Sequence, residues 1–177
     1  MTTKGDGLHR LVVRRARVGD GSELVRLWLD EAAHLVGLEP EGFRQPNTDG
    51  LAELFDERLA EERPGTAHFV AELDGRLVGA VLVRLIEPMA NAERQIIRDL
   101  AETRAEIPSL GVESASRRKG IGRRLMGEAE AWAQHRGATK VTLSTYARSP
   151  LSNPFYQSLG YTPVSIVYQR KLQSRRE

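Results

Sequence analysis

The segment Glu113–Met126 limits the folds open to this chain more than any other stretch. An extended stretch ends at Val112, and a helical pattern begins a few residues later, with Gly120 and Gly122 at the junction. The apolar side chains that follow recur with a helical period and predict one buried face: Ile121, Leu125, Ala129, Trp132 and Ala133. The segment therefore predicts a strand that passes through a glycine-containing turn into a helix.

The start of this helix has the chemistry of an anion site. The first turn of a helix carries backbone N–H groups without an intrahelical acceptor, and the helix macrodipole adds positive potential there. The two glycines remove side chains that would keep an anion away from those N–H groups. Cationic side chains surround them: Arg117, Arg118, Lys119 and Arg123. We predict a phosphate cradle, with a basic, solvated helix start as the alternative.

Two common phosphate-binding motifs do not fit this segment. A P-loop has lysine and then serine or threonine after its last glycine, but here Lys119 precedes Gly120 and Arg123 follows Gly122. The dinucleotide fingerprint fails because Leu125 stands where its third glycine belongs. The phosphate group expected here is therefore not that of a P-loop nucleotide or of a Rossmann dinucleotide.

The composition excludes several kinds of protein and of functional site. The 177 residues fit one domain over residues 11–172, between a disordered leader (1–10) and a basic tail (173–177). The absence of cysteine excludes disulfides, thiolate metal sites and cysteine nucleophiles, and the four histidines show no metal-binding spacing. No apolar run has membrane-spanning length and no signal-peptide core is present. We expect a soluble, cytoplasmic protein without a metal.

The remaining pattern predicts alternating strands and helices. Asp74-Gly75 predicts a hairpin turn, Asp20 with Glu23 resembles a capping box, and Trp28 is expected in the core. Strands are expected over Leu11–Arg17, Thr66–Leu73, Arg76–Ile86, Arg104–Val112, Thr139–Tyr146 and Tyr161–Leu172. Helices are expected from Asp20 to before Gly37, then over Asp49–Glu62, Gly120–Arg136 and Ser149–Ser158, with loops over Gly37–Thr48 and Pro88–Thr103.

Three segments together resemble one enzyme family. Arg117-x-x-Gly120-x-Gly122 resembles the R/Q-x-x-G-x-G/A signature of the GNAT superfamily of acetyltransferases, which holds the pyrophosphate of acetyl-CoA. The strand Ala105–Val112 and the segment Phe155–Tyr161 match at family-like separations. The resemblance implies an α/β (α+β) fold: a mixed, mostly antiparallel sheet of about six to seven strands, about four flanking helices and a splayed central strand pair.

The resemblance also implies roles for individual residues. The strand before the cradle would hold the pantetheine arm through Leu110, Gly111 and Val112, because Pro108 and Gly111 weaken regular pairing. Tyr156 would contact the cofactor and protonate the departing thiolate. The pyrophosphate would be held by Arg117, Arg118, Lys119, Gly120, Ile121, Gly122 and Arg123.

Two assignments stay open at this point. Many relatives have an asparagine seven residues before the tyrosine, whereas this chain has Ser149 there and Asn153 nearby, so either could contact CoA. A base must deprotonate the acceptor amine, and Glu106 on the strand is the first candidate, ahead of Glu72 and Glu113. For each carboxylate the alternative is a solvated side chain.

The predicted function is transfer of an acetyl group from acetyl-CoA, as cosubstrate, to an amine by direct attack in a ternary complex. The alternatives are a catalytically inactive CoA-binding sensor or interaction module, and a nucleic-acid binder that uses the basic segment. The acceptor stays open among a small amine, an antibiotic, an amino acid and a protein. We expect no nucleic-acid or membrane partner and leave a homodimer open.

Overall fold

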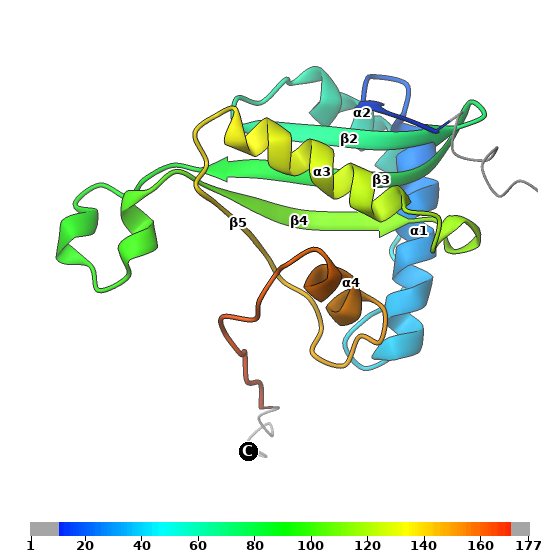
Figure 1. Cartoon of the computed structure of the whole chain (residues 1–177). Coiled ribbons are helices and arrows are strands. Elements are labelled where there is room, and N and C mark those ends of the chain that lie inside the picture. Colours follow the sequence, from blue (N-terminus) through cyan, green and yellow to red (C-terminus); the bar gives the residue numbers. More distant parts are fainter. Residues whose placement is uncertain (1–10, 171–177) are drawn as a thin grey trace, which may run out of the picture. The chain divides into compact units, whose positions relative to one another are not determined.

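The computed structural model describes residues 11–170, which fall into two compact units, Met1–Ser144 and Thr145–Glu177. The first unit holds a sheet of five strands in the order β1-β2-β3-β4-β5 (Figure 1). Neighbouring strands are antiparallel except β4 and β5, which are parallel. The strands are β1 (Leu11–Arg15), β2 (Thr66–Leu73), β3 (Arg76–Ile86), β4 (Arg104–Val112) and β5 (Lys140–Leu143).

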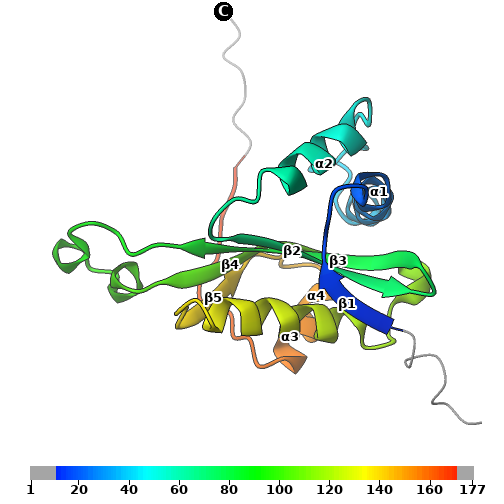
Figure 2. The ribbon, with the colours of Figure 1, turned by 90° about the horizontal axis from the view of Figure 1, so that it is seen from above.

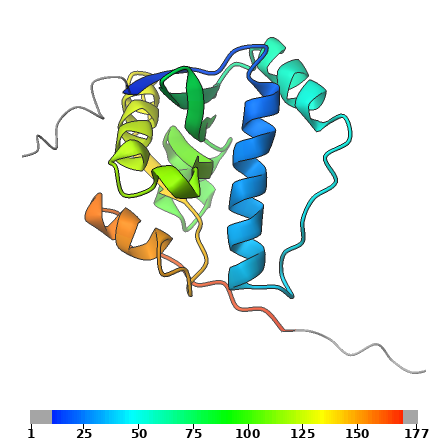
Figure 3. The same cartoon turned by 90° about the vertical axis from the view of Figure 1, so that its right-hand side faces the viewer.

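Helices cover both faces of this sheet. α1 (Gly21–Leu38) and α2 (Leu51–Ala60) lie on one face, and α3 (Ile121–Gln134) lies on the other (Figures 2 and 3). α3 packs closely because β3 has Gly79 beneath it: a Cβ at that position would lie 3.0 Å from Leu125 Cδ1. Leu125 and Met126 are fully buried on this face.

Several predicted elements are confirmed. Asp74 and Gly75 both have positive φ, 53° and 81°, as the turn of the predicted β2–β3 hairpin requires. The five predicted apolar side chains of α3 are all buried, and the helix gives way to Gly137 with φ 82°. The segment between β3 and β4 contains two short 3₁₀ turns, η1 (Ala92–Arg94) and η2 (Arg98–Ala101), within the loop expected over Pro88–Thr103.

The predicted capping box at the start of α1 is wrong. The Asp20 carboxylate makes no cap hydrogen bond to its own helix; it accepts bonds from the Arg14 guanidinium at 2.7 Å and from the Arg17 N–H at 2.9 Å. Burial raises the Asp20 pKa, but these two donors outweigh it and hold the pKa below its usual value. The Gly21 N–H instead donates to Asp56 of α2, at 2.9 Å.

The strand count is also corrected. Five strands are present in the described residues, where six to seven were expected. In the second unit α4 (Ser152–Ser158) forms within the predicted helix Ser149–Ser158 but starts three residues later. Residues 161–170 adopt no strand, and the rest of the expected strand Tyr161–Leu172 lies outside the described residues. The segment alternates in polarity, but a strand also needs a neighbour for its backbone groups, and Val164 to Tyr168 are largely exposed.

Candidate active site

The turn before α3 forms an open cradle of backbone groups. Arg118 and Gly120 both have positive φ, 65° and 80°, so the chain curls immediately before the helix begins at Ile121. The first helical bond runs from the Arg124 N–H to the Gly120 carbonyl at 3.1 Å, so the earlier N–H groups have no intrahelical acceptor. A Cβ on Gly120 would meet nothing within 4 Å. The space beside these N–H groups is open to an anion.

Helix α1 fixes the chain that leads into the cradle. Asp30 accepts from the Ser114 N–H at 3.0 Å and from the Ser114 hydroxyl at 2.7 Å. Glu113 is only 8% exposed, and its carboxylate forms ion pairs with Arg26 of α1, at 2.9 Å, and with Arg76 of β3. A buried carboxylate with charged partners on two elements resists movement. The cradle therefore rests on a rigid support.

Arg117 is engaged by the protein itself. Its Nε donates to the Val112 carbonyl at 3.0 Å, and its Nη2 contacts Asp30 at 3.4 Å. Lys119 donates to the Ala115 carbonyl at 3.3 Å, while the Arg118 and Arg123 side chains are exposed at the cradle. The Ile121 side chain is buried in the core, so only its backbone N–H can serve an anion. Arg117 thus orients the loop, and the exposed cations supply the local positive charge.

Strand β4 carries an irregularity where its sequence predicted one. Leu82 of β3 pairs with Ser109 of β4, and Arg84 pairs with Glu106. One residue of β3 therefore lies opposite two residues of β4, Ile107 and Pro108, which is the pattern of a β-bulge. The parallel pairing with β5 ends at Ile107, opposite Leu143. Residues 108–112 of β4 therefore have no strand neighbour on the β5 side within the described chain. This open edge agrees with the expected splay.

The open edge presents alternate backbone groups. The Glu113 N–H donates to the Val78 carbonyl of β3, so Gly111 also points its backbone groups toward β3. Leu110 and Val112 then point their backbone groups away from β3, toward the open edge. The Val112 carbonyl accepts a hydrogen bond from Arg117. The Val112 N–H and the N–H and carbonyl of Leu110 are then the backbone groups at the open edge. Their contact with a pantetheine arm stays a prediction.

The three carboxylates considered as bases are all ion-paired. Glu106 lies 2.6 Å from the Arg84 guanidinium on the neighbouring strand. Glu72 accepts from Arg14 at 2.8 Å, and Glu113 is held by Arg26 and Arg76. An ion pair occupies part of the acceptor capacity of a carboxylate. Glu106 remains the candidate of these three that lies on the strand with the open edge.

The second unit carries the other predicted site residues. Ser149 is 6% exposed, and its hydroxyl contacts Ser152 at 3.0 Å. The Asn153 amide nitrogen donates to the carbonyls of Tyr146, Ala147 and Ser149, at 3.0 to 3.2 Å. Asn153 thus holds the turn before α4 with its amide donors. The Tyr156 ring makes edge contacts with two aromatic neighbours, Phe155 and Tyr161.

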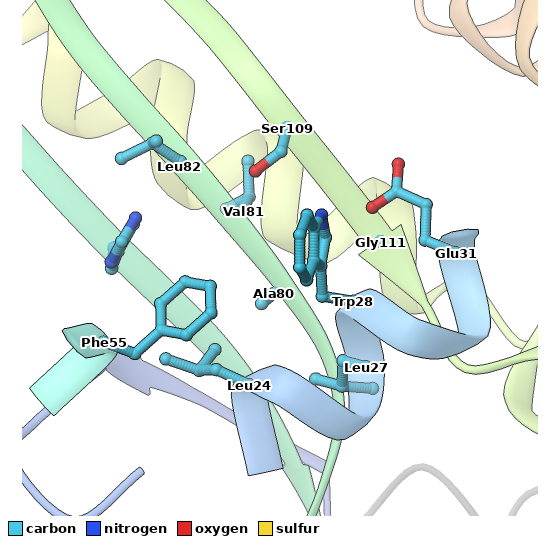
Figure 4. A pocket seen from close by; sticks show the side chains of 11 residues that line it. Leu24, Leu27, Trp28, Glu31, Phe55, Ala80, Val81, Leu82, Ser109 and Gly111 are labelled. Atoms are coloured by element: carbon cyan, nitrogen blue, oxygen red, sulfur yellow. The ribbon is translucent and has the colours of Figure 1, made fainter. Parts of the chain in front are cut away.

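A cavity of about 60 Å³ lies between the sheet and the helices α1 and α2. Leu24, Trp28 and Glu31 line it from α1, Phe55 from α2, and Ser109 and Gly111 from β4 (Figure 4). The Glu31 carboxylate points toward β4, and its Oε2 would lie 3.4 Å from a Cβ built on Gly111. The carboxylate therefore lies at van der Waals distance from the strand at Gly111.

Burial shifts both titratable groups of the cavity toward their neutral forms. The pKa of Glu31 is raised, chiefly because burial disfavours the carboxylate, while Arg117 opposes this shift and Asp30 adds to it. The pKa of His68 is lowered by burial first and then by Arg58 and Arg15. At neutral pH His68 is therefore uncharged. Glu31 is the acidic group of the cavity.

Sequence reasoning missed this cavity. Trp28 was expected in the core, but it is 39% exposed and forms part of the cavity wall. Glu31 received no role, because it follows the polar Asp30 on the same helix and nothing in its local pattern distinguishes it. The available signal was its spacing of three residues from Trp28, which places both on one side of α1.

Within residues 11–170, no group of three or more histidine or acidic side chains could hold a metal ion. Over the same residues, no helix combines the length and the apolar composition that crossing a bilayer requires.

Comparison with known families and proteins points in one direction. The model of the family described as "Acetyltransferase (GNAT) family" matches residues 32–161, well over half of the chain. The match contains β4, the cradle and α4, and begins one residue after Glu31. N-acetylaspartate synthetase of Xenopus tropicalis is 28% identical over 111 residues, which is 63% of this chain and 36% of that protein. The chain thus matches little more than a third of that relative.

Solved structures share the fold. The BH1408 protein from Bacillus halodurans, crystallised as a mutant, superposes with a TM-score of 0.79 at 20% identity, over 92% of this chain and 99% of that one. An aminoglycoside acetyltransferase from an uncultured soil metagenomic sample, in complex with sisomicin, gives a TM-score of 0.65 at 18% identity, over 93% and 98%. At such identities the likeness establishes the fold and not the substrate.

Proposed function

Because the chain belongs to the acetyltransferase (GNAT) family, we propose that it transfers an acetyl group from acetyl-CoA to an amine. The observation that carries this proposal is that two features follow each other closely along the chain. The open edge of β4 ends at Val112, and the cradle of N–H groups follows at Arg118 to Gly122. An extended pantetheine arm and a pyrophosphate are joined in the same order in acetyl-CoA.

Each part of the cofactor has a suitable partner in this arrangement. The pyrophosphate would sit at the N-terminus of α3, where backbone N–H groups and the helix dipole favour an anion. Arg118, Lys119 and Arg123 would add positive charge. The pantetheine amides would pair with Leu110 and with the Val112 N–H, as a strand would. This pairing would hold the thioester beside β4.

The reaction proposed is direct attack of the neutral amine on the thioester carbonyl within a ternary complex. Freeing a lysine-like amine of its proton at pH 7 costs about (10.4 − 7) × 1.36, roughly 4.6 kcal/mol. A nearby proton acceptor lowers this cost, and Tyr156 is proposed to return a proton to the leaving thiolate. Alignment of amine and thioester supplies the larger part of the rate. No acyl-enzyme is needed.

A second candidate function is a CoA-binding module without catalysis. The observation that favours it is the ion pair between Glu106 and Arg84, which engages the base that the sequence predicted. Such a module would use the same cradle, so cofactor binding alone does not separate the two functions.

The test is a screen of acceptor amines with acetyl-CoA, followed by release of free thiol. We expect acetyl-CoA-dependent thiol release with at least one class among small amines, aminoglycosides, amino acids and peptide amines. Heat-denatured protein and reactions without amine are the controls. Binding of acetyl-CoA with no turnover in any class would favour the non-catalytic module, and absence of binding would overturn both functions.

A further inference from the structure

The cavity beneath α1 and α2 adjoins the same stretch of β4 that forms the open edge. Leu110 and Val112 point backbone groups to the edge, while Ser109 and Gly111 line the cavity. Residues 109–112 of β4 therefore lie between the proposed thioester position and the cavity. The cavity and the open edge thus share one short stretch of β4.

The walls of the cavity are apolar apart from a few groups. Trp28, Phe55, Leu24 and Leu27 form the helix side, and Ala80 and Leu82 form the sheet side. None of the described residues that line it is a lysine or an arginine. Glu31 makes no hydrogen bond to another described residue, in contrast to Glu106, Glu72 and Glu113. A half-buried carboxylate without a hydrogen-bond donor lacks the partner that such groups normally have.

We propose that this cavity binds the ammonium group of the acceptor, with Glu31 as its counter-ion and proton acceptor, and that it favours amines whose neighbouring carbon bears no carboxylate. This inference rests on the proposed function and names the acceptor class that the sequence left open. The cavity has a volume of about 60 Å³ and is partly open to the outside. It fits an amino group and its first carbons rather than a whole large acceptor.

The proton balance of the reaction is simple. The ammonium gives one proton to the Glu31 carboxylate, and the neutral nitrogen attacks the thioester carbon. The C–N bond forms and the C–S bond breaks, and the second proton lost by nitrogen balances the proton gained by the leaving thiolate. Glu31 then releases its proton to solvent. The raised pKa of Glu31 brings its basicity closer to that of the amine, which favours this transfer.

Charge explains the expected selectivity against amino acids. An α-carboxylate on the acceptor would enter an apolar cavity beside the negative Glu31, with no cationic side chain in the lining to pair with it. Arg117 is near enough to lower the Glu31 pKa, but it does not line the cavity, and its Nε and Nη2 contact Val112 and Asp30. Asp30 adds further negative charge, and His68 stays neutral. Burying an unpaired carboxylate is costly.

The direct test uses three matched probes on the full chain: pentylamine, norleucine and norleucinamide. Norleucine is pentylamine with an added α-carboxylate, and norleucinamide has nearly the same size without the charge. Binding is followed in the presence of CoA by the indole N–H signals of the two tryptophans, assigned with Trp132→Phe. We expect pentylamine and norleucinamide to shift the Trp28 signal and to bind at least tenfold more tightly than norleucine.

The variant test uses Glu31→Gln with Glu128→Gln as matched control, since Glu128 is exposed on α3 at the opposite face of the sheet. Glu31→Gln should weaken pentylamine binding at least tenfold and lower turnover by about 10² to 10⁴. It should also abolish the fall in activity as pH drops through the Glu31 pKa. Glu31→Asp, which keeps the carboxylate, should restore part of the binding.

Thermal stability distinguishes a role of Glu31 in amine binding from a role in stabilising the fold. Because the Glu31 pKa is raised, its ionised form is less favourable in the folded than in the unfolded chain. This unfavourable contribution is present above the folded pKa and vanishes as pH falls below the unfolded value. Glu31→Gln should therefore melt at the same or a higher temperature than the wild type at pH 8. A lower melting temperature of the variant would show that Glu31 stabilises the folded chain.

The outcomes distinguish this inference from the proposed function. Acetylation of other amines, with no shift of the Trp28 signal by pentylamine, would overturn the inference and leave the enzyme. Equal binding of norleucine and pentylamine, or an unchanged pH profile in Glu31→Gln, would do the same. Binding of pentylamine at Glu31 without any binding of acetyl-CoA would keep the amine site and overturn the acetyltransferase.

Discussion

The hydroxyl group of Tyr156 is the proton donor that the proposed function assigns to the leaving thiolate. Its ring lies 5.1 Å from Phe155 and 5.9 Å from Tyr161, centroid to centroid, in edge-to-face contacts. Tyr156→Phe keeps the ring and these contacts and removes only the hydroxyl. We expect turnover to fall by about 10² to 10⁴, with little change in acetyl-CoA affinity.

Turnover and thermal stability of Tyr156→Phe are to be measured in one preparation. Full activity in a stable variant would make Tyr156 a packing residue and leave water as the proton source. If the variant loses stability along with activity, a pH–rate profile of the wild type decides the point, because a tyrosine acid gives an alkaline limb.

At the scale of residues, the cradle could be predicted and the acceptor cavity could not. The spacing of Arg117, Gly120 and Gly122 is local, and the N-terminus of a helix binds anions wherever it occurs. Glu31 and Trp28 depend on what α1 faces, and their neighbours Ser109 and Gly111 follow some 80 residues later in the chain. Arg117 shows the limit of motif transfer, because its guanidinium donates to the protein itself.

At the scale of elements, the contact between α1 and α2 positions the cavity walls. A Cβ on Gly21 would lie 2.3 Å from the Ala52 carbonyl oxygen, and 2.9 Å from the Asp56 carboxylate that accepts from the Gly21 N–H. Gly21→Ala should therefore push the two helices apart. We expect a loss of about 1–3 kcal/mol in the free energy of unfolding, measured by denaturant titration.

Gly37→Ala on the same helix is the matched control. A Cβ there would meet nothing within 4 Å, so alanine should stabilise α1 by up to about 1 kcal/mol through its higher helix propensity. Opposite signs for the two variants are the expected result. A neutral or stabilising Gly21→Ala would show that α1 and α2 do not approach as closely as described.

Elements defined by local pattern were predicted well, but the last expected strand does not form over residues 161–170. Alternation and the Asp74-Gly75 turn were enough for the β2–β3 hairpin, since its two strands are neighbours in sequence. The stretch Tyr161–Arg170 has the composition of a strand, but Val164 and Val167 are 87% and 91% exposed. Composition alone does not provide a neighbouring strand. The capping box failed for a related reason, because Arg14 on β1 binds Asp20.

At the scale of the whole molecule, the two proposed binding sites lie on opposite faces of the sheet. α3 and its cradle belong to one face, where Gly79 admits the helix, and the acceptor cavity belongs to the other, beneath α1 and α2. The β4 strand is common to both. The central claim is that acetyl-CoA binds at the glycine turn that leads from β4 into α3.

Calorimetric titration of acetyl-CoA into the full chain tests this claim most directly, with Gly120→Glu compared against Gly137→Glu. Both glycines have nearly the same φ, 80° and 82°, and open space around a Cβ, so both variants share the same strain and charge at opposite ends of α3. The wild type and Gly137→Glu should bind, with roughly 2.7 kcal/mol of added stability at a hundredfold excess over Kd, and Gly120→Glu should not. Equal binding by the two variants, or none by the wild type, would contradict the account.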